Sequence, residues 1–205
     1  MFKYTSFQNI PRKITNRHSA ALNALVVACG LLMTSAAGAA SSVTELDTGP
    51  DGKPIIRFAV PDELRPAPII SFVDLSGQTH SLADYRGSLI ALVFWATWCV
   101  PCREEMPSLE SLAKTLAGEK FVILPVSLDR DGPDAVRRFY EDYKIEKLPI
   151  FVAKIGDVLS AFKLGGIPTT IFIDAEGRAI ARVLGDRDWS DPEVVEVVRK
   201  LIAGG

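Results

Sequence analysis

Hydrophobic and polar positions from residue 66 onward follow two different periods, and their order predicts alternating strands and helices. The continuous apolar runs Leu89–Trp95 and 121–128 are typical of strands that are buried on both faces. Apolar residues recur at helical spacing over residues 106–116 and again over residues 136–143. Because strands and helices alternate, we predict a core sheet that is partly parallel.

Shorter segments complete this pattern, and the turn residues between them predict two hairpins. We expect the corresponding strands at residues 69–73, 79–82, 149–153, 169–173 and 179–184. A short helix is expected to carry Val158 and Phe162, and a last helix to carry Val194 and Val198. Ser190 and Glu193 have the spacing of a capping box for that last helix.

The first 39 residues contain four basic residues and no acidic ones, and no charged residue occurs between Ser19 and Thr44. A basic head followed by an apolar stretch is typical of an export signal. Three ways of processing this N-terminal segment remain open. It is cleaved after Ala39, it is retained as a membrane anchor over residues of about 19–40, or it is lipidated at Cys29, which is the least favoured. We therefore predict a periplasmic protein, either soluble after signal cleavage or tethered to the inner membrane.

The rest of the chain divides into two parts. Turn signals in residues 40–65 predict a linker with a peripheral segment, and residues 66–205 are long enough for one domain with its own core. After residue 39 the chain carries 19 basic and 25 acidic residues, a formal charge of −6. This charge argues against nucleic acid or an anionic membrane surface as the partner.

Cys99 and Cys102 form a C-x-x-C pair between the strand Leu89–Trp95 and a helix, which is the context of a redox motif. At the start of the helix, free backbone N–H groups and the positive dipole end would stabilise the Cys99 thiolate. The thiolate is the attacking species in thiol–disulfide exchange. We expect Cys99 to attack, and Cys102, one turn further in, to resolve the mixed disulfide.

Metal sites fit the sequence poorly. Structural zinc needs four nitrogen or sulfur ligands, and beyond the pair there are only Cys29, His18 and His80. Covalent haem attachment needs histidine after the second cysteine, where Arg103 stands. We expect no metal or other cofactor, and we take the redox-active group to be a Cys99–Cys102 disulfide.

Residues 94–107, FWATWCVPCREEMP, and 166–170, GIPTT, resemble thiol–disulfide oxidoreductases of the TlpA/ResA type. The resemblance covers residues of about 66–203. It implies an α/β thioredoxin fold, with a mixed sheet of four to five central strands flanked by helices, an N-terminal hairpin, and a central insertion matching residues 145–165.

The resemblance also implies a substrate site. Pro168 matches the cis-proline of the family, which would turn the Ile167 backbone toward the disulfide, where a substrate peptide could pair as an added strand. Trp98 and Pro101 are expected to complete this docking surface. By contrast, we expect Trp95 in the core and His80 on the surface of the hairpin, and the acidic loop at residues 186–191 receives no role.

One position departs from thioredoxin, since Val93 stands where thioredoxin carries a buried aspartate. Glu105, three residues after Cys102 and on the same helical face, matches the glutamate of similar proteins. As a partly buried carboxyl with a raised pKa, it could accept the Cys102 proton. Alternatively, Glu105 is a solvated acid of the first helical turn, as we expect for Glu104.

No histidine separates the two cysteines, which favours a reducing site. The resemblance implies a reductase of cysteine pairs in exported metalloproteins, with apocytochrome c, a copper-site protein or a copper chaperone as partner and a membrane thiol as electron donor. A thiol peroxidase would need a Pro-x-x-x-Thr-x-x-Cys pattern, but Thr97 is only two residues before Cys99. A non-enzymatic copper carrier would need a distal histidine, for which His80 is the one candidate after residue 39.

Overall fold

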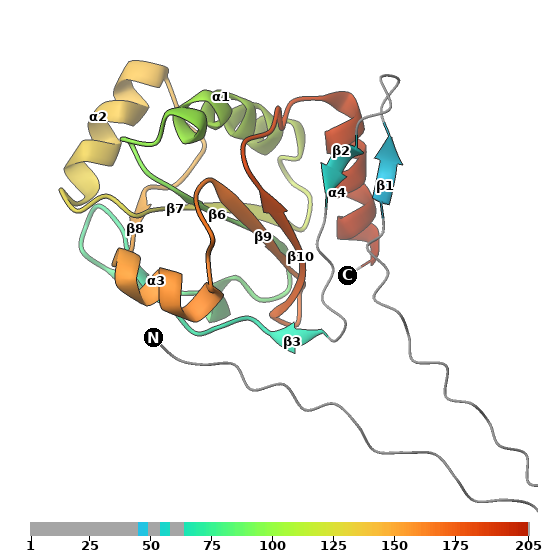
Figure 1. The fold of residues 1–205 in the computed structure, drawn as a ribbon, viewed down its shortest axis with the longest axis horizontal. Coiled ribbons are helices and arrows are strands. Elements are labelled where there is room, and N and C mark those ends of the chain that lie inside the picture. Colours follow the sequence, from blue (N-terminus) through green and yellow to red (C-terminus); the bar gives the residue numbers. More distant parts are fainter. Residues whose placement is uncertain (1–44, 49–53, 58–63, 205) are drawn as a thin grey trace, which may run out of the picture. The chain divides into compact units, whose positions relative to one another are not determined.

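The computed structural model describes residues 45–48, 54–57 and 64–204 (Figure 1). The predicted export signal, with Cys29 and the cleavage site at Ala39, lies outside these residues. Within them, no helix has both the length and the apolar character needed to cross a membrane.

A mixed sheet of eight strands forms the centre of the domain (Figure 1). Its order is β3-β10-β9-β6-β7-β8-β4-β5. The strands are β3 (Arg65–Pro66), β4 (Ser71–Val73), β5 (Thr79–Ser81), β6 (Leu89–Trp95), β7 (Phe121–Ser127), β8 (Phe151–Val152), β9 (Thr169–Ile173) and β10 (Arg178–Leu184). A separate two-stranded sheet pairs β1 (Glu45–Thr48) with β2 (Pro54–Arg57), within the segment predicted as a linker.

The predicted thioredoxin architecture is confirmed in the five central strands. β6 pairs in parallel with β7 and antiparallel with β9, and β7 pairs in parallel with β8. The β4–β5 hairpin extends the sheet beyond β8, as predicted. The strands β3, β4 and β5 bring the total from five to eight, and none of these is longer than three residues.

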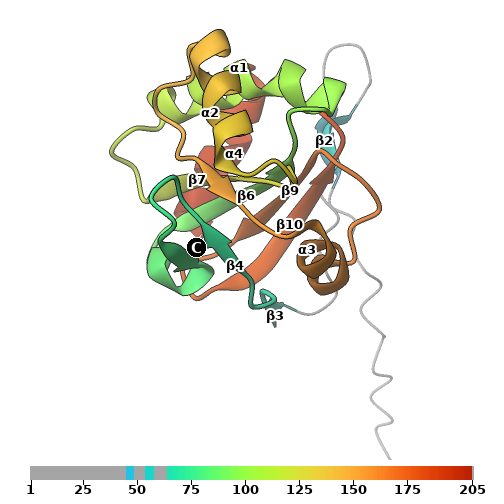
Figure 2. The ribbon, with the colours of Figure 1, turned by 90° about the vertical axis from the view of Figure 1, so that its left-hand side faces the viewer.

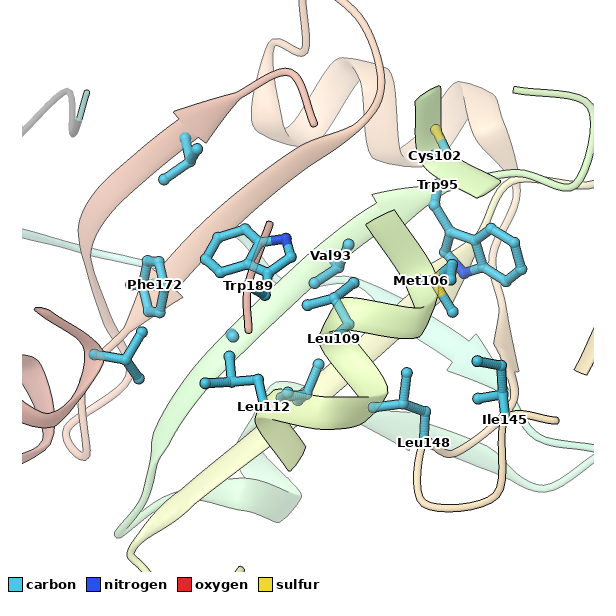
Figure 3. Close-up of a cluster of buried hydrophobic side chains, with 14 of the residues drawn as sticks. Val93, Trp95, Cys102, Met106, Leu109, Leu112, Ile145, Leu148, Phe172 and Trp189 are labelled. Carbon is cyan, nitrogen blue, oxygen red and sulfur yellow. The ribbon is translucent and has the colours of Figure 1, made fainter. Parts of the chain in front are cut away.

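Helices cover both faces of the sheet (Figure 2). They are α1 (Val100–Thr115), α2 (Pro133–Tyr143), α3 (Ile155–Phe162), α4 (Pro192–Gly204) and the short 3₁₀ helix η1 (Leu82–Tyr85). Alternate residues of β6 point to opposite faces. Val93 and Trp95 join the buried cluster beneath α1, α2 and α4 (Figure 3), whereas Leu92 and Phe94 pack with α3. The insertion at residues 145–165 contains β8 and α3.

Two local predictions are wrong. Ser190 and Glu193 do not form a capping box, because α4 begins at Pro192, and Asp191 Oδ1 accepts the Glu193 backbone N–H at 2.8 Å. Proline at the first helical position sets the start, so the cap lies one residue later than predicted. His80 is partly buried rather than on the surface, since its ring stacks on Phe72 and its Nε2 lies 2.9 Å from Asp74 Oδ2.

Candidate active site

The two cysteines lie at the start of α1 and are joined by a disulfide, with 5.2 Å between their Cα atoms. Cys99 is the N-cap residue, and its Sγ accepts the backbone N–H of Cys102 at 3.3 Å. Cys99 is 6% exposed and Cys102 is fully buried. The predicted placement is therefore confirmed: the more exposed cysteine lies at the helix N-terminus, where unpaired N–H groups stabilise a thiolate.

The rim around the disulfide contains the four residues predicted to bind substrate. Trp98 is 61% exposed, and Pro101 lies in the first turn of α1. The Ile167 carbonyl oxygen lies 3.8 Å from Cys99 Sγ, and the Ile167–Pro168 peptide bond is cis. The structure thus brings residues 167–168 beside the disulfide from 68 positions away along the chain. Substrate binding by this rim stays a prediction.

Glu105 is only 2% exposed, so the alternative that it is a solvated acid is wrong, whereas its neighbour Glu104 is exposed as predicted. Its Oε2 accepts the indole N–H of Trp189 at 3.1 Å. Its Oε1 has no hydrogen-bond partner among the described residues. Burial raises the pKa of Glu105 to about 8, although the Trp189 indole and the Arg187 backbone lower it in part. A carboxyl with such a pKa can take or give a proton near neutral pH.

Trp189 is a site residue that the sequence reasoning missed. It belongs to the loop at residues 186–191, to which no role was assigned, and it is fully buried, with its ring centroid 6.2 Å from that of Phe172. A tryptophan within a run of charged residues is a usable signal, because so large an apolar side chain is seldom left in solvent. Its partner Glu105 is 84 positions away, which no local pattern reveals.

Asp129 is a second missed residue, and it holds the turn that leads into Cys99. Its carboxylate accepts the Thr97 backbone N–H at 2.9 Å and the Thr97 hydroxyl at 2.7 Å. The Ser127 hydroxyl donates to it at 2.6 Å. The aspartate follows the buried strand β7, whose end pairs with the end of β6, and this placement is the signal that could have found it. The Thr97 hydroxyl is committed to Asp129.

The cysteine pair is the candidate reactive group of this site. Within residues 64–204, no group of three or more His, Cys, Asp or Glu side chains is arranged to hold a metal ion. Cys99 can be attacked from the rim, and the glutamate lies three residues after Cys102, which places their Cβ atoms about 5–6 Å apart on one helical face. This arrangement suits thiol–disulfide exchange with an internal proton acceptor.

Comparisons with known proteins agree with this chemistry. The model of the AhpC/TSA family matches residues 54–181. The thiol-disulfide oxidoreductase ResA of Bacillus thuringiensis subsp. konkukian (strain 97-27) is 32% identical over 136 residues, which are 66% of this chain and 76% of that protein. ResA of Geobacillus kaustophilus (strain HTA426) is 35% identical over 127 residues, 62% of this chain and 72% of that protein. Among solved structures, the thioredoxin domain of a thiol-disulfide oxidoreductase from Bacteroides vulgatus superposes with a TM-score of 0.59 at 28% identity, covering 67% of this chain and 96% of that one.

Proposed function

The chain belongs to the AhpC/TSA family and is a ResA-like thiol–disulfide oxidoreductase of the thioredoxin superfamily; from this premise we propose that it reduces cysteine pairs of exported metalloproteins. The observation that carries the proposal is a C-x-x-C pair at a helix start with a nearly fully buried glutamate one turn behind it. The proposed substrates are proteins whose paired cysteines must be open before haem or copper is inserted, namely apocytochrome c, a copper-site protein or a copper chaperone.

The proposed reaction moves two electrons from the dithiol to the substrate. The Cys99 thiolate attacks one sulfur of the substrate disulfide, and the other substrate sulfur leaves as a thiolate. Cys102 then gives its proton to the Glu105 carboxylate and attacks Cys99 Sγ. This step closes the Cys99–Cys102 disulfide and expels the second substrate sulfur, which takes up a proton from solvent. A membrane thiol donor would restore the dithiol.

Substrate recognition would use the rim around Cys99. Trp98 offers an exposed apolar face. The backbone at Ile167 lies beside Cys99 Sγ, where an extended substrate segment could pair with it. The basic and then apolar N-terminal sequence supports export, so that this surface would face the periplasm from a soluble or a membrane-tethered domain.

Two other functions are less well supported. A thiol peroxidase would need the hydroxyl of a threonine at its reactive cysteine, but the Thr97 hydroxyl donates to Asp129. A copper carrier would need His80 near the cysteines. His80 lies on β5, however, and the strands β7, β8 and β4 stand between β5 and β6 in the sheet. His80 is also bonded to Asp74.

Substrate trapping tests the proposal. Cys102→Ser leaves Cys99 able to attack but removes the thiol that releases the substrate, so a mixed disulfide should accumulate in the periplasm. We expect an exported protein whose own cysteine pair binds haem or copper, and we expect no adduct from the Cys99→Ser/Cys102→Ser control. Recovery of only unrelated misfolded secreted proteins would indicate general disulfide repair instead. An active Cys99→Ser variant would refute the mechanism.

The direction of the reaction has its own test. Equilibration with glutathione measures the reduction potential of the cysteine pair. We expect a value nearer to that of thioredoxin, about −270 mV, than to that of DsbA, about −120 mV, because Val100 and Pro101 supply no side chain that stabilises a thiolate. A potential at the DsbA end would assign disulfide formation rather than reduction.

A further inference from the structure

The loop that follows β10 packs over Glu105 and is tied to α1 at two points. The Trp189 indole N–H donates to Glu105 Oε2 at 3.1 Å. The Trp189 backbone N–H donates to Ser108 Oγ at 3.0 Å, and the Ser108 hydroxyl lies 2.8 Å from the Glu105 carbonyl oxygen. Both contacts hold the indole against the same turn of α1.

The base of this loop is fixed to the segment beside Cys99. Gly185 has a φ of +82°, a conformation that favours glycine, and its N–H donates to the Pro168 carbonyl at 3.0 Å. On its other side the Trp189 ring packs in the buried cluster that contains Val93 and Phe172 (Figure 3). The indole therefore has one orientation, set by the sheet, by α1 and by residues 167–168.

The two oxygens of Glu105 have different surroundings. An indole N–H can only donate, so Oε2 is held as an acceptor. Oε1 has no hydrogen-bond partner among the described residues. Glu105 also borders a cavity of about 430 Å³, which is lined on its other sides by Ser108 of α1 and by Asp186 and Arg187 of the loop. Oε1 is therefore the oxygen that an incoming proton reaches without competing with the indole N–H.

We propose that Trp189 is a positioning residue for Glu105: it holds Oε2 as an acceptor, so that Oε1 takes the proton from Cys102. The inference rests on the proposed function of Glu105. In the step, the S–H bond of Cys102 breaks and an O–H bond forms at Oε1. The electron pair stays on sulfur, which attacks Cys99 Sγ, and the substrate sulfur leaves with the electrons of the broken S–S bond.

Neighbouring groups shift the pKa of Glu105, so the proposal can be tested by titration. Among the described residues, the charged groups that shift its pKa are Asp186, which raises it, and Arg187, which lowers it. The neutral Trp189 indole and the Arg187 backbone also lower it, each by a hydrogen bond to the carboxylate. On α1, Cys102 cannot titrate while the disulfide is closed. In the oxidised protein the titration midpoint of the Glu105 carboxyl therefore reports on Glu105 and on the loop residues that shift its pKa.

The first measurement follows the wild-type protein and uses Trp189→Phe only to assign one resonance. The chain has three tryptophans, and therefore three indole N–H resonances in a ¹⁵N–¹H NMR spectrum. In the oxidised protein we expect the resonance that is missing from Trp189→Phe to shift with pH, with the same midpoint near 8 as the Glu105 carboxyl. Resonances of Trp95 and Trp98 should not follow that midpoint. A Trp189 resonance that stays constant while Glu105 titrates would overturn the proposal.

Substitutions then test the direction of the effect. Trp189→Phe removes the hydrogen bond, so the Glu105 midpoint, read from its ¹³C-labelled carboxyl, should rise by about one pH unit. The matched control is Trp95→Phe, because Trp95 is equally buried but its Nε1 has no partner among the described residues. This control should leave the midpoint unchanged. Equal midpoints in the two variants would overturn the proposal.

The two charged residues of the loop provide a pair of variants that leave the buried side chains in place. Asp186→Asn should lower the Glu105 midpoint and Arg187→Gln should raise it, because each removes one charge that acts on the carboxyl. Shifts of the same sign would contradict the loop's control of Glu105.

Failure of this inference differs from failure of the proposed function. If Glu105→Gln slows the release of substrate from Cys99 but Trp189→Phe leaves the Glu105 midpoint unchanged, the glutamate has its role and the tryptophan does not. If Trp189→Phe shifts the midpoint but Glu105→Gln releases substrate at the wild-type rate, Glu105 takes no proton from Cys102, and both proposals fall. A raised midpoint in Trp189→Phe, together with slow release at neutral pH that recovers at higher pH, is the expected result.

Discussion

Glu105 and Glu110 lie five residues apart on α1 and are almost equally buried, with 2% and 4% of their surface exposed, yet their pKa values shift in opposite directions. Burial disfavours the charged form of both carboxyls. The difference must therefore come from what each carboxylate contacts.

Both oxygens of Glu110 are occupied. They accept the Lys147 backbone N–H at 3.1 and 2.9 Å, and Oε1 lies 3.0 Å from the ammonium of Lys114. Desolvation raises the pKa of Glu110, but these partners outweigh it, and the pKa falls below its ordinary value. Glu110 is a structural carboxylate that fastens α1 to the segment before β8.

Within the described residues Glu105 has neutral hydrogen-bond donors and no cationic one: the Trp189 indole donates to Oε2, the Arg187 backbone also lowers the pKa, and Oε1 has no partner that meets the distance and angle of a hydrogen bond. Desolvation then dominates and raises its pKa to about 8. An acid left partly unsatisfied behind a reactive cysteine is typical of a functional site. The comparison teaches that burial alone does not identify a proton acceptor, and that incomplete hydrogen bonding does.

The largest expected effect is on the pH dependence of stability. Glu105 has a higher pKa in the folded than in the unfolded chain, so it destabilises the fold increasingly as pH rises from about 4.5 to about 8. Glu105→Gln removes this loss. At pH 9 we expect the variant to be more stable than the wild type by on the order of 4 kcal/mol, measured by denaturant unfolding.

Glu110→Gln should change the stability of the fold in the opposite direction and over a lower pH range. Because the pKa of Glu110 is lower in the folded chain, its carboxylate stabilises the fold above the unfolded pKa, and this contribution is lost as the pH falls through the folded pKa.

If Glu105→Gln showed no gain in stability at pH 9 relative to pH 5, the raised pKa of Glu105 would be wrong.

The second effect separates stability from activity. Glu110→Gln removes a charged acceptor of the Lys147 N–H and should cost about 1–2 kcal/mol of unfolding free energy at pH 7. Its rate of disulfide exchange should remain that of the wild type, because Glu110 lies more than two turns from Cys102. A large loss of exchange in this variant would erase the distinction between the two glutamates.

The third and smallest effect is a difference in thiol reactivity between the two cysteines, which, like the two glutamates, have different surroundings. In the reduced protein we expect Cys99 to react with iodoacetamide about tenfold faster than Cys102 at pH 7, and its labelling to reach half-maximum below about pH 8.5. The cause is the helix start at Cys99 and the full burial of Cys102. Faster labelling of Cys102 would reverse their assigned roles.

Most of the central fold and most of the site could be predicted from the sequence, whereas Trp189 and Asp129 were missed. The buried strands and amphipathic helices have strong periodic signals, and Cys99, Cys102 and Glu105 lie close together in one motif. The two-residue strand β3 is too short to carry a period, and β8 is shorter than the strand predicted at residues 149–153. Trp189 and Asp129 act through partners 84 and 32 positions away, so only the folded chain shows what they contact.

The most direct test of the proposed role of Glu105 is the release of a model peptide from its mixed disulfide with Cys99, followed in a single turnover across pH. In the wild type we expect the release rate to rise through a midpoint near 8, where Glu105 becomes a carboxylate. Glu105→Gln should release the peptide about 100-fold more slowly and without that midpoint, whereas the exposed neighbour Glu104→Gln should behave as the wild type. A Glu105→Gln variant with the wild-type rate and pH dependence would contradict the assignment of Glu105 as the proton acceptor.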